Sequence, residues 1–110
     1  MGTTLKQVEF VAYLGPPEIH DGVIRRVRRE NANCEVEIRG ADGSSISVHF
    51  CGVTEVQENR AEGMMLYAIA EYRRLGGPRL FVFANWESED DATLSVAAKE
   101  VTFQVTHEDG

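Results

Sequence analysis

Two runs of alternating apolar and polar residues, joined by a short loop that contains glycine, constrain the fold of this chain most strongly. The apolar members are Cys34, Val36 and Ile38 before the loop and Ile46, Val48 and Phe50 after it. Alternation with a period of two on both sides of such a loop is typical of a β-hairpin with one buried face. We therefore expect residues 33–51 to form two antiparallel strands.

The length of the loop sets the register of this hairpin. A three-residue loop at 41–43 places Ile38 opposite Ile46, so that both apolar sets lie on the same face. A two-residue turn would pair Ile38 with Ser47 and send the core residues to opposite faces, which is unfavourable when one face is buried. Gly43 suits the left-handed conformation that a three-residue loop requires near its end.

The same register predicts the surroundings of a histidine and of both cysteines. It places Glu35 opposite His49, which we interpret as an ordinary polar pair because no nucleophile has a definable place beside it. It points Cys34 and Cys51 to opposite faces, whereas a disulfide needs Cβ atoms that are directed at each other. We expect both thiols to stay reduced.

A further strand is predicted just before the hairpin. Residues 23–29 should pair with the first hairpin strand across a turn at Asn31 and Ala32, and this pairing sets Arg28 opposite Glu35. Opposite charges that face each other across strands stabilise a sheet. The arginines of this segment therefore favour a charge-paired sheet face over an anion-binding site.

The remaining segments include two that fit more than one structure. Alternation at 79–84 and 93–105 predicts strands, with a bulge or break near Lys99 where the parity shifts. Residues 5–14 fit a strand or a short helix that ends at two prolines, and we favour the helix. Residues 64–74 alternate as a strand does, but their Met, Leu, Ala, Glu and Arg content favours a helix.

These segments predict a single, mostly β domain over residues 1–110. The expected architecture is an antiparallel barrel or sandwich of about six to seven strands with one or two short helices. The alternative is an α+β fold with a helix at 64–74. A chain of this length can bury one modest core, and its longest uninterrupted apolar stretch is too short to span a bilayer.

Acidic residues outnumber basic ones and concentrate toward the end of the chain. The net charge is −7, and residues 86–110 alone hold seven acidic side chains and one basic side chain. Phosphate backbones and anionic membranes repel such a chain, so we expect neither nucleic acid nor a membrane as a partner. A basic protein would be complementary. The N-terminus lacks the layout of a secretory signal, which favours a cytoplasmic location.

Three residues are candidates for a binding site. His20 and Asp21 follow two prolines, and Trp86 lies beside the acidic stretch at 87–91. Tryptophan is enriched among residues that dominate the binding energy of interfaces. The His-Asp pair has an alternative structural role, in which Asp21 caps a turn and His20 bonds locally. None of the three histidines has neighbours at metal-ligand spacing, so we predict no metal, no cofactor and no catalytic residue.

The segment around this polar pair matches a family pattern. Pro17, His20, Asp21 and Ile24 fit a Pro-x-x-His-Asp-(Ala/Gly)-x-Ile opening, with Gly22 where alanine is usual. Over about a dozen residues the chain resembles small bacterial immunity proteins, which neutralise toxins, and uncharacterised bacterial domains with a similar opening. The resemblance implies a mostly β fold, a strand in the second ambiguous segment, and protein binding in place of catalysis.

Three functions are compatible with these observations. The leading hypothesis is a non-enzymatic bacterial protein-binding module, of which an immunity-type protein is one form. The first alternative is a small-molecule binder or minor enzyme with a pocket near His20 and Asp21. The second alternative is a structural homodimer in which Trp86 or an exposed strand edge forms the contact.

Overall fold

The computed structural model describes residues 8–86 and 91–107 of the chain. In these residues it contains nine β-strands and one 3-10 helix. The strands are β1 (Val8–Leu14), β2 (Val23–Glu30), β3 (Asn33–Arg39), β4 (Ser45–Cys51), β5 (Glu55–Asn59), β6 (Leu66–Arg74), β7 (Arg79–Asn85), β8 (Thr93–Ala98) and β9 (Glu100–Thr106), and the 3-10 helix is η2 (Pro17–Ile19). All neighbouring strands pair antiparallel.

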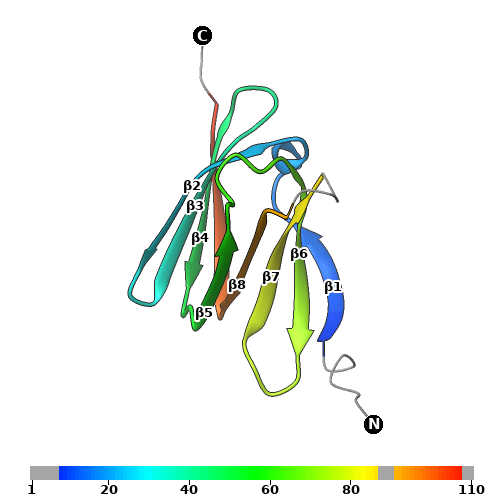
Figure 1. Ribbon diagram of the computed structural model, residues 1–110, viewed down its shortest axis with the longest axis vertical. Coiled ribbons are helices and arrows are strands. Elements are labelled where there is room, and N and C mark those ends of the chain that lie inside the picture. Colours follow the sequence, from blue (N-terminus) through cyan, green and yellow to red (C-terminus); the bar gives the residue numbers. More distant parts are fainter. Residues whose placement is uncertain (1–7, 87–90, 108–110) are drawn as a thin grey trace.

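The strands form two sheets that pack against each other as a sandwich (Figure 1). One sheet has the order β1-β6-β7-β8-β5 and the other has the order β2-β3-β4-β9. The prediction of a mostly β, antiparallel fold is confirmed, and the architecture is a sandwich, not a closed barrel. The strands outnumber the expected six or seven, partly because both ambiguous segments are strands. No helix in the described residues is long and apolar enough to cross a membrane.

The core lies between the facing sides of the two sheets. Its largest fully buried side chains are Phe50, Phe81, Ile24, Ile38, Ile46, Met64, Leu66, Ile69, Leu94, Val36, Val48 and Val96. Aromatic rings join the two sheets, because the Phe50 ring of β4 lies 5.2 Å from the Phe81 ring and 6.0 Å from the Phe83 ring of β7. Rings of this size remove a large apolar area from water, which is the main driving force of folding.

The predicted hairpin is confirmed as β3 and β4. Ile38 pairs with Ile46, as the alternation of apolar residues in the two strands predicts. The loop between the strands has three residues, because the Gly40 N–H donates to the Ser44 carbonyl at 2.8 Å and closes it. Gly43 has a φ of +91°, the left-handed conformation expected at this position.

The pairing of β2 with β3 and the break at Lys99 are also confirmed. Arg28 lies opposite Glu35. β8 ends at Ala98 and β9 begins at Glu100, and the two strands belong to different sheets. The core lies on opposite sides of the two sheets. A chain that crosses from one sheet to the other must therefore change which of its alternate residues point to the core. The shift of parity in the sequence therefore marks the change of sheet.

The helix expected over 5–14 is wrong. Its described part is β1, an edge strand that pairs with β6, and residues 5–7 lie outside the described part of the chain. A β-bulge explains the ambiguity, because the register shifts between Phe10 and Ala12 and leaves Val11 as an extra residue. An extra residue replaces a spacing of two on one face by a spacing of three, and this imitates a helix.

The helix favoured by composition over the second ambiguous segment is wrong as well. β6 lies between β1 and β7, so it is paired on both sides. A second register shift, between Leu66 and Ala68, leaves Tyr67 as the bulge residue. Leu66 and Ile69 are consequently both buried, three positions apart as on a helix face. Helix propensity differs among ordinary residues by less than about 0.7 kcal/mol each, and burial in a paired strand outweighs it. The family resemblance implied this strand.

The two cysteines differ in exposure, as their opposite faces predict. Both thiols are free, with Cys34 buried and Cys51 exposed. Burial raises the pKa of the Cys34 thiol, and the Arg29 guanidinium offsets this only in part. We expect a thiol reagent to modify Cys51 in the folded protein and Cys34 only after unfolding, because the thiolate is the reactive form. Mass spectrometry of protein labelled with and without denaturant would test this, and rapid labelling of both thiols in the folded protein would contradict it.

Candidate functional site

The three predicted binding residues lie together on the surface, although they are far apart in the sequence. The Trp86 indole N–H donates a hydrogen bond to Asp21 Oδ1 at 2.7 Å. The centroids of the His20 and Trp86 rings are 5.5 Å apart, and His20 Nε2 lies 3.8 Å from Asp21 Oδ1. The side chains of His20 and Asp21 are each about half exposed. The cluster is therefore accessible to a partner.

The chain around the start of β6 holds this cluster in place. The Asp21 N–H donates to the Leu66 carbonyl at 2.9 Å, and the Trp86 N–H donates to the Met65 carbonyl at 3.0 Å. Asp21 has a φ of +69°, in the left-handed region that Asp tolerates better than most residues. The sequence analysis offered local hydrogen bonds as the structural role of His20 and Asp21. This is corrected, because both side chains bond to distant segments of the chain.

Tyr67, the bulge residue of β6, completes the cluster and was missed by the sequence analysis. Its carbonyl accepts a hydrogen bond from His20 Nδ1 at 3.1 Å, and Nδ1 must carry the proton because a carbonyl can only accept. Its ring lies 5.6 Å from the His20 ring and 5.2 Å from the Trp86 ring. Bulges leave a residue out of the pairing pattern and redirect its side chain. No local pattern in the sequence marks where this bulge falls.

A row of aromatic rings extends from this cluster along β6 and β1. The Tyr13 ring lies 6.0 Å from Tyr67, the Phe10 ring 5.0 Å from Tyr13, and the Tyr72 ring 5.7 Å from Phe10. We call the following residues the aromatic surface: Phe10, Tyr13, His20, Tyr67, Tyr72 and Trp86. Phe10 and Tyr13 are three positions apart, and they share a face because the bulge at Val11 shifts the parity of β1.

The pocket expected near His20 is small. A cavity of about 170 Å³ lies beside Tyr13, Pro17, His20 and Tyr67. Pockets for drug-sized ligands usually occupy about 300–1,000 Å³. This cavity is of a size that suits one amino-acid side chain more than a cofactor.

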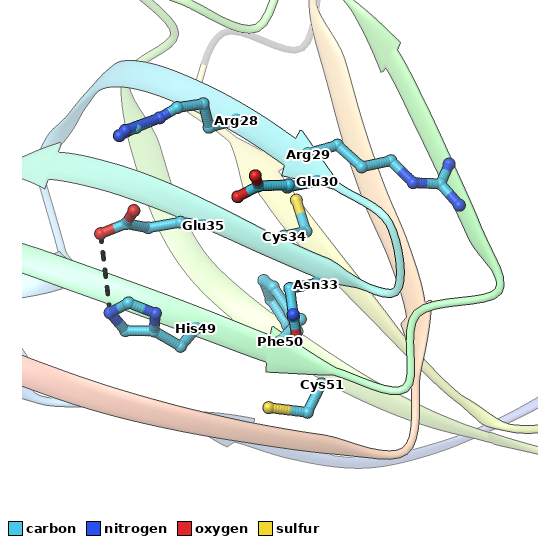
Figure 2. Close-up of a pocket in the computed structure, with 9 residues that line it drawn as sticks. All are labelled: Arg28, Arg29, Glu30, Asn33, Cys34, Glu35, His49, Phe50 and Cys51. Carbon is cyan, nitrogen blue, oxygen red and sulfur yellow. Dashed lines mark ion pairs between the residues drawn. The ribbon is translucent and has the colours of Figure 1, made fainter.

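A larger cavity of about 610 Å³ lies on the other sheet, near the turn between β2 and β3 (Figure 2). It is lined by Arg28, Arg29, Glu30, Asn33, Cys34, Glu35, His49, Phe50 and Cys51. Glu35 and His49 face each other as predicted, with Oε2 and Nε2 3.6 Å apart. Cationic and anionic side chains both line this cavity, so it presents no single charge to a ligand. It matches the polar sheet face that the sequence predicts.

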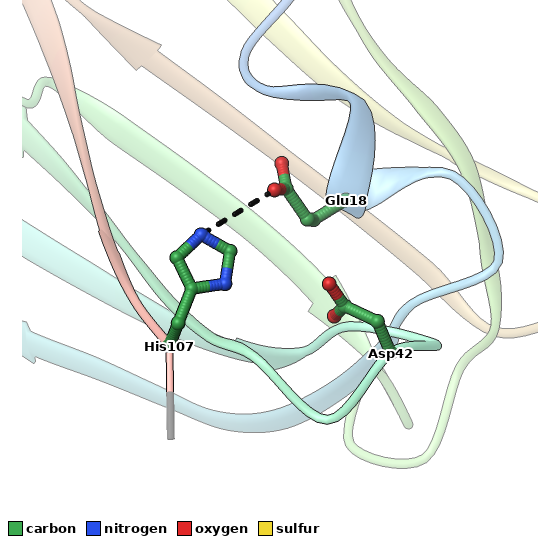
Figure 3. A group of neighbouring side chains, drawn as sticks. All are labelled: Glu18, Asp42 and His107. Carbon is green, nitrogen blue, oxygen red and sulfur yellow. Dashed lines mark ion pairs between the residues drawn. The ribbon is translucent and has the colours of Figure 1, made fainter. Parts of the chain in front are cut away.

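A third group of side chains comes from three separate segments (Figure 3). Glu18 belongs to η2, Asp42 to the β3–β4 loop, and His107 follows β9. One potential ligand atom of each lies within 4.8 Å of the others. The backbone N–H of Ser44 donates to Asp42 Oδ1 at 2.9 Å, and this bond lowers the pKa of the Asp42 carboxyl. The sequence analysis predicted no metal ligand. Spacing along the chain cannot reveal a group whose members come from three distant segments.

The acidic stretch beside Trp86 is described only at its end. Residues 87–90 lie outside the described part of the chain. Asp91 forms an ion pair with Arg60, and its carbonyl accepts a hydrogen bond from Asn59 Nδ2 at 2.9 Å. The described end of this stretch is therefore tied to β5 and the residue that follows it.

Neither a scan against protein-family models nor searches of curated proteins and of solved structures find a match to this chain. Function is therefore inferred from its own residues. The aromatic surface is the strongest candidate, because it contains His20 and Trp86 in direct contact and Asp21 is hydrogen-bonded to Trp86.

Proposed function

We propose that this protein is a non-enzymatic, cytoplasmic bacterial module that binds another protein through the aromatic surface. The observation that carries the proposal is the exposure of this row of rings: Tyr13 is 59% exposed, Phe10 48% and Trp86 44%. Aromatic side chains contribute strongly at protein interfaces, because each buries a large area and has few rotatable bonds to immobilise. An immunity-type protein, which the sequence resembles, would bind its toxin in this way.

The central rings are ordered before a partner binds. The Trp86 indole N–H is bonded to Asp21, and the Trp86 ring meets the Tyr67 ring at an angle of 88°. The His20 imidazole is bonded to the Tyr67 carbonyl. Side chains that are already ordered lose less conformational entropy on association, which favours affinity.

The charge of the chain favours a basic partner. The net charge is −7, and the acidic stretch follows Trp86 directly in the sequence. Asp21, beside the central rings, is half exposed. Complementary charge accelerates encounter and selects against acidic competitors. The partner would therefore combine an apolar contact patch with surrounding Lys and Arg side chains.

Other classes of ligand fit the aromatic surface less well. The cavity beside His20, of about 170 Å³, is smaller than the usual pocket for a small molecule. The neighbouring rings are steeply inclined, because the Tyr67 ring is turned by 83° from Tyr13 and by 88° from Trp86. A protein surface, with side chains of many shapes, adapts to rings at such angles.

The edge strand β1 supports a homodimer as a second candidate. No described strand pairs with its outer side, and unpaired strand edges are templates for association. Its residues Val8, Phe10 and Val11 are each more than 40% exposed. Analytical ultracentrifugation over a range of concentrations separates the candidates. A purified chain that stays monomeric at about 100 μM would count against the homodimer.

Replacing Tyr67 or Trp86 by alanine is expected to weaken capture of the partner by about 30-fold, because loss of a dominant interface residue costs about 2 kcal/mol. Immobilised wild type and variants would be incubated with a lysate of the natural host at low and high salt. Quantitative mass spectrometry would then compare the bound proteins. We expect a basic protein that the wild type captures at low salt and that both variants lose.

Leu75→Ala is the matched control, because Leu75 is 74% exposed and lies outside the aromatic surface. This variant should capture the same protein as the wild type. Asp21→Asn keeps an acceptor for the indole N–H and removes one charge, so it should retain binding but weaken its dependence on salt. Identical sets of captured proteins for the wild type and both ring variants would refute the proposal.

A further inference from the structure

We propose that Glu18, Asp42 and His107 form a binding site for a divalent transition-metal ion, for which Zn²⁺ is the best match. Their potential ligand atoms all lie within 4.8 Å of one another, and Glu18 Oε2 is 3.7 Å from His107 Nε2. Ligands that surround a tetrahedral zinc ion at about 2.0–2.2 Å are separated by about 3.4 Å. Small rotations of these side chains therefore bring all three atoms into coordination range.

The imidazole of His107 is already oriented as a metal ligand. Its Nδ1 forms a hydrogen bond with the Ser44 hydroxyl at 2.8 Å, and Ser44 is only 2% exposed. This bond leaves Nε2 as the nitrogen that faces Glu18 (Figure 3). A hydrogen bond to the second ring nitrogen is the usual means by which proteins fix a metal-binding histidine.

The same serine also positions the second carboxylate. The Ser44 N–H donates to Asp42 Oδ1, so a single buried residue contacts two of the three proposed ligands. The carboxylate keeps its other oxygen for a metal ion, since each carboxylate oxygen is a separate acceptor.

Gly40 lies where the Asp42 carboxylate and the backbone of Glu18 approach each other closely. A Cβ atom at this position would lie 3.0 Å from Asp42 Oδ1 and 3.2 Å from the Glu18 carbonyl oxygen. Any larger residue would therefore press η2 and the β3–β4 loop apart. Glycine here is consistent with a site that draws the two segments together.

The set of donors selects the class of ion. One imidazole nitrogen and two carboxylate oxygens suit Zn²⁺, whereas Ca²⁺ takes about six to eight oxygen ligands. The three donors come from η2, the β3–β4 loop and the residue after β9. A bound ion would tie these segments together and stabilise the fold, because the unfolded chain does not hold the donors in place.

Calorimetric titration of the chelator-treated protein, without an affinity tag, with ZnCl₂ would test the proposal. We expect one saturable site per chain and a rise in Tm of about 10 °C when free Zn²⁺ is about 100-fold above Kd. Glu18→Gln and Asp42→Asn should each weaken binding more than about tenfold. The second substitution retains the acceptor for the Ser44 N–H, so the loop should stay folded, and circular dichroism would verify this.

Glu35→Gln is the matched control. Glu35 Oε2 lies 3.6 Å from His49 Nε2, a similar carboxylate–imidazole pair that the described residues do not extend to a group of three. This variant should bind Zn²⁺ as the wild type does. The proposal would be overturned if no saturable binding occurred up to about 1 mM Zn²⁺, or if Glu18→Gln and Asp42→Asn left the affinity unchanged.

Discussion

Replacing Phe81 by alanine is expected to lower the free energy of unfolding by about 3–5 kcal/mol. Phe81 has an exposure of 0%, and its ring lies 5.2 Å from Phe50 on the opposite sheet. The substitution removes the transfer free energy of the ring and leaves a cavity that paired strands cannot close. A domain has a total stability of about 5–15 kcal/mol, so this loss is a large share of it. The same loss should lower Tm by about 12 °C or more.

Urea titrations followed by circular dichroism would measure this loss. Leu75→Ala, at a residue that is 74% exposed, should change the free energy of unfolding by less than about 0.5 kcal/mol. Phe81→Leu retains much of the buried volume and should lie between the two. A loss for Phe81→Ala as small as that for Leu75→Ala would mean that the sheets do not pack through this ring.

A second large effect is expected at Gly15, between β1 and η2. Its φ is +95°, and a Cβ atom here would lie 2.5 Å from Ile19 Cδ1 and 2.8 Å from Phe103 Cε2. In Gly15→Ala the left-handed backbone costs about 1–3 kcal/mol, and repacking of the crowded side chains costs about 1–3 kcal/mol more. Displacement of η2 would also move Glu18 and His20, so Zn²⁺ binding and partner capture should both weaken.

Gly63→Ala separates the two contributions. Gly63 has a nearly equal φ of +93°, but nothing lies within 4 Å of the position that its Cβ would occupy. Its substitution should cost only the backbone part, which chemical denaturation of both variants would measure. Equal losses for Gly15→Ala and Gly63→Ala would contradict the close approach of Ile19 and Phe103 to Gly15.

Parity along the sequence was sufficient wherever the strands are regular. Ile38 and Ile46 pair as predicted, because a slip of one residue would turn the apolar side of β4 toward solvent. Parity failed at Val11 and Tyr67, where one extra residue enters a strand. The position of a bulge depends on the partner strand, so the resulting spacing of three is indistinguishable locally from a helix.

The candidate site was predictable in part. Residue type alone drew attention to His20, Asp21 and Trp86, and the structure brings them into contact. Tyr67 and Phe10 were missed, because their exposure follows from the two bulges. Chemistry can nominate polar and aromatic side chains from the sequence, but which of them share a face depends on the register of every intervening strand.

The sequence by itself determined the β-hairpin register, the residues able to form a core and the break at Lys99. All of these depend on neighbours a few positions apart, for which the period of two is a sufficient guide. Only the tertiary structure decided that two sheets stack as a sandwich, that Trp86 meets Asp21, and that His107 meets Glu18. These contacts join distant segments through the packing of whole sheets, and no local period encodes that packing.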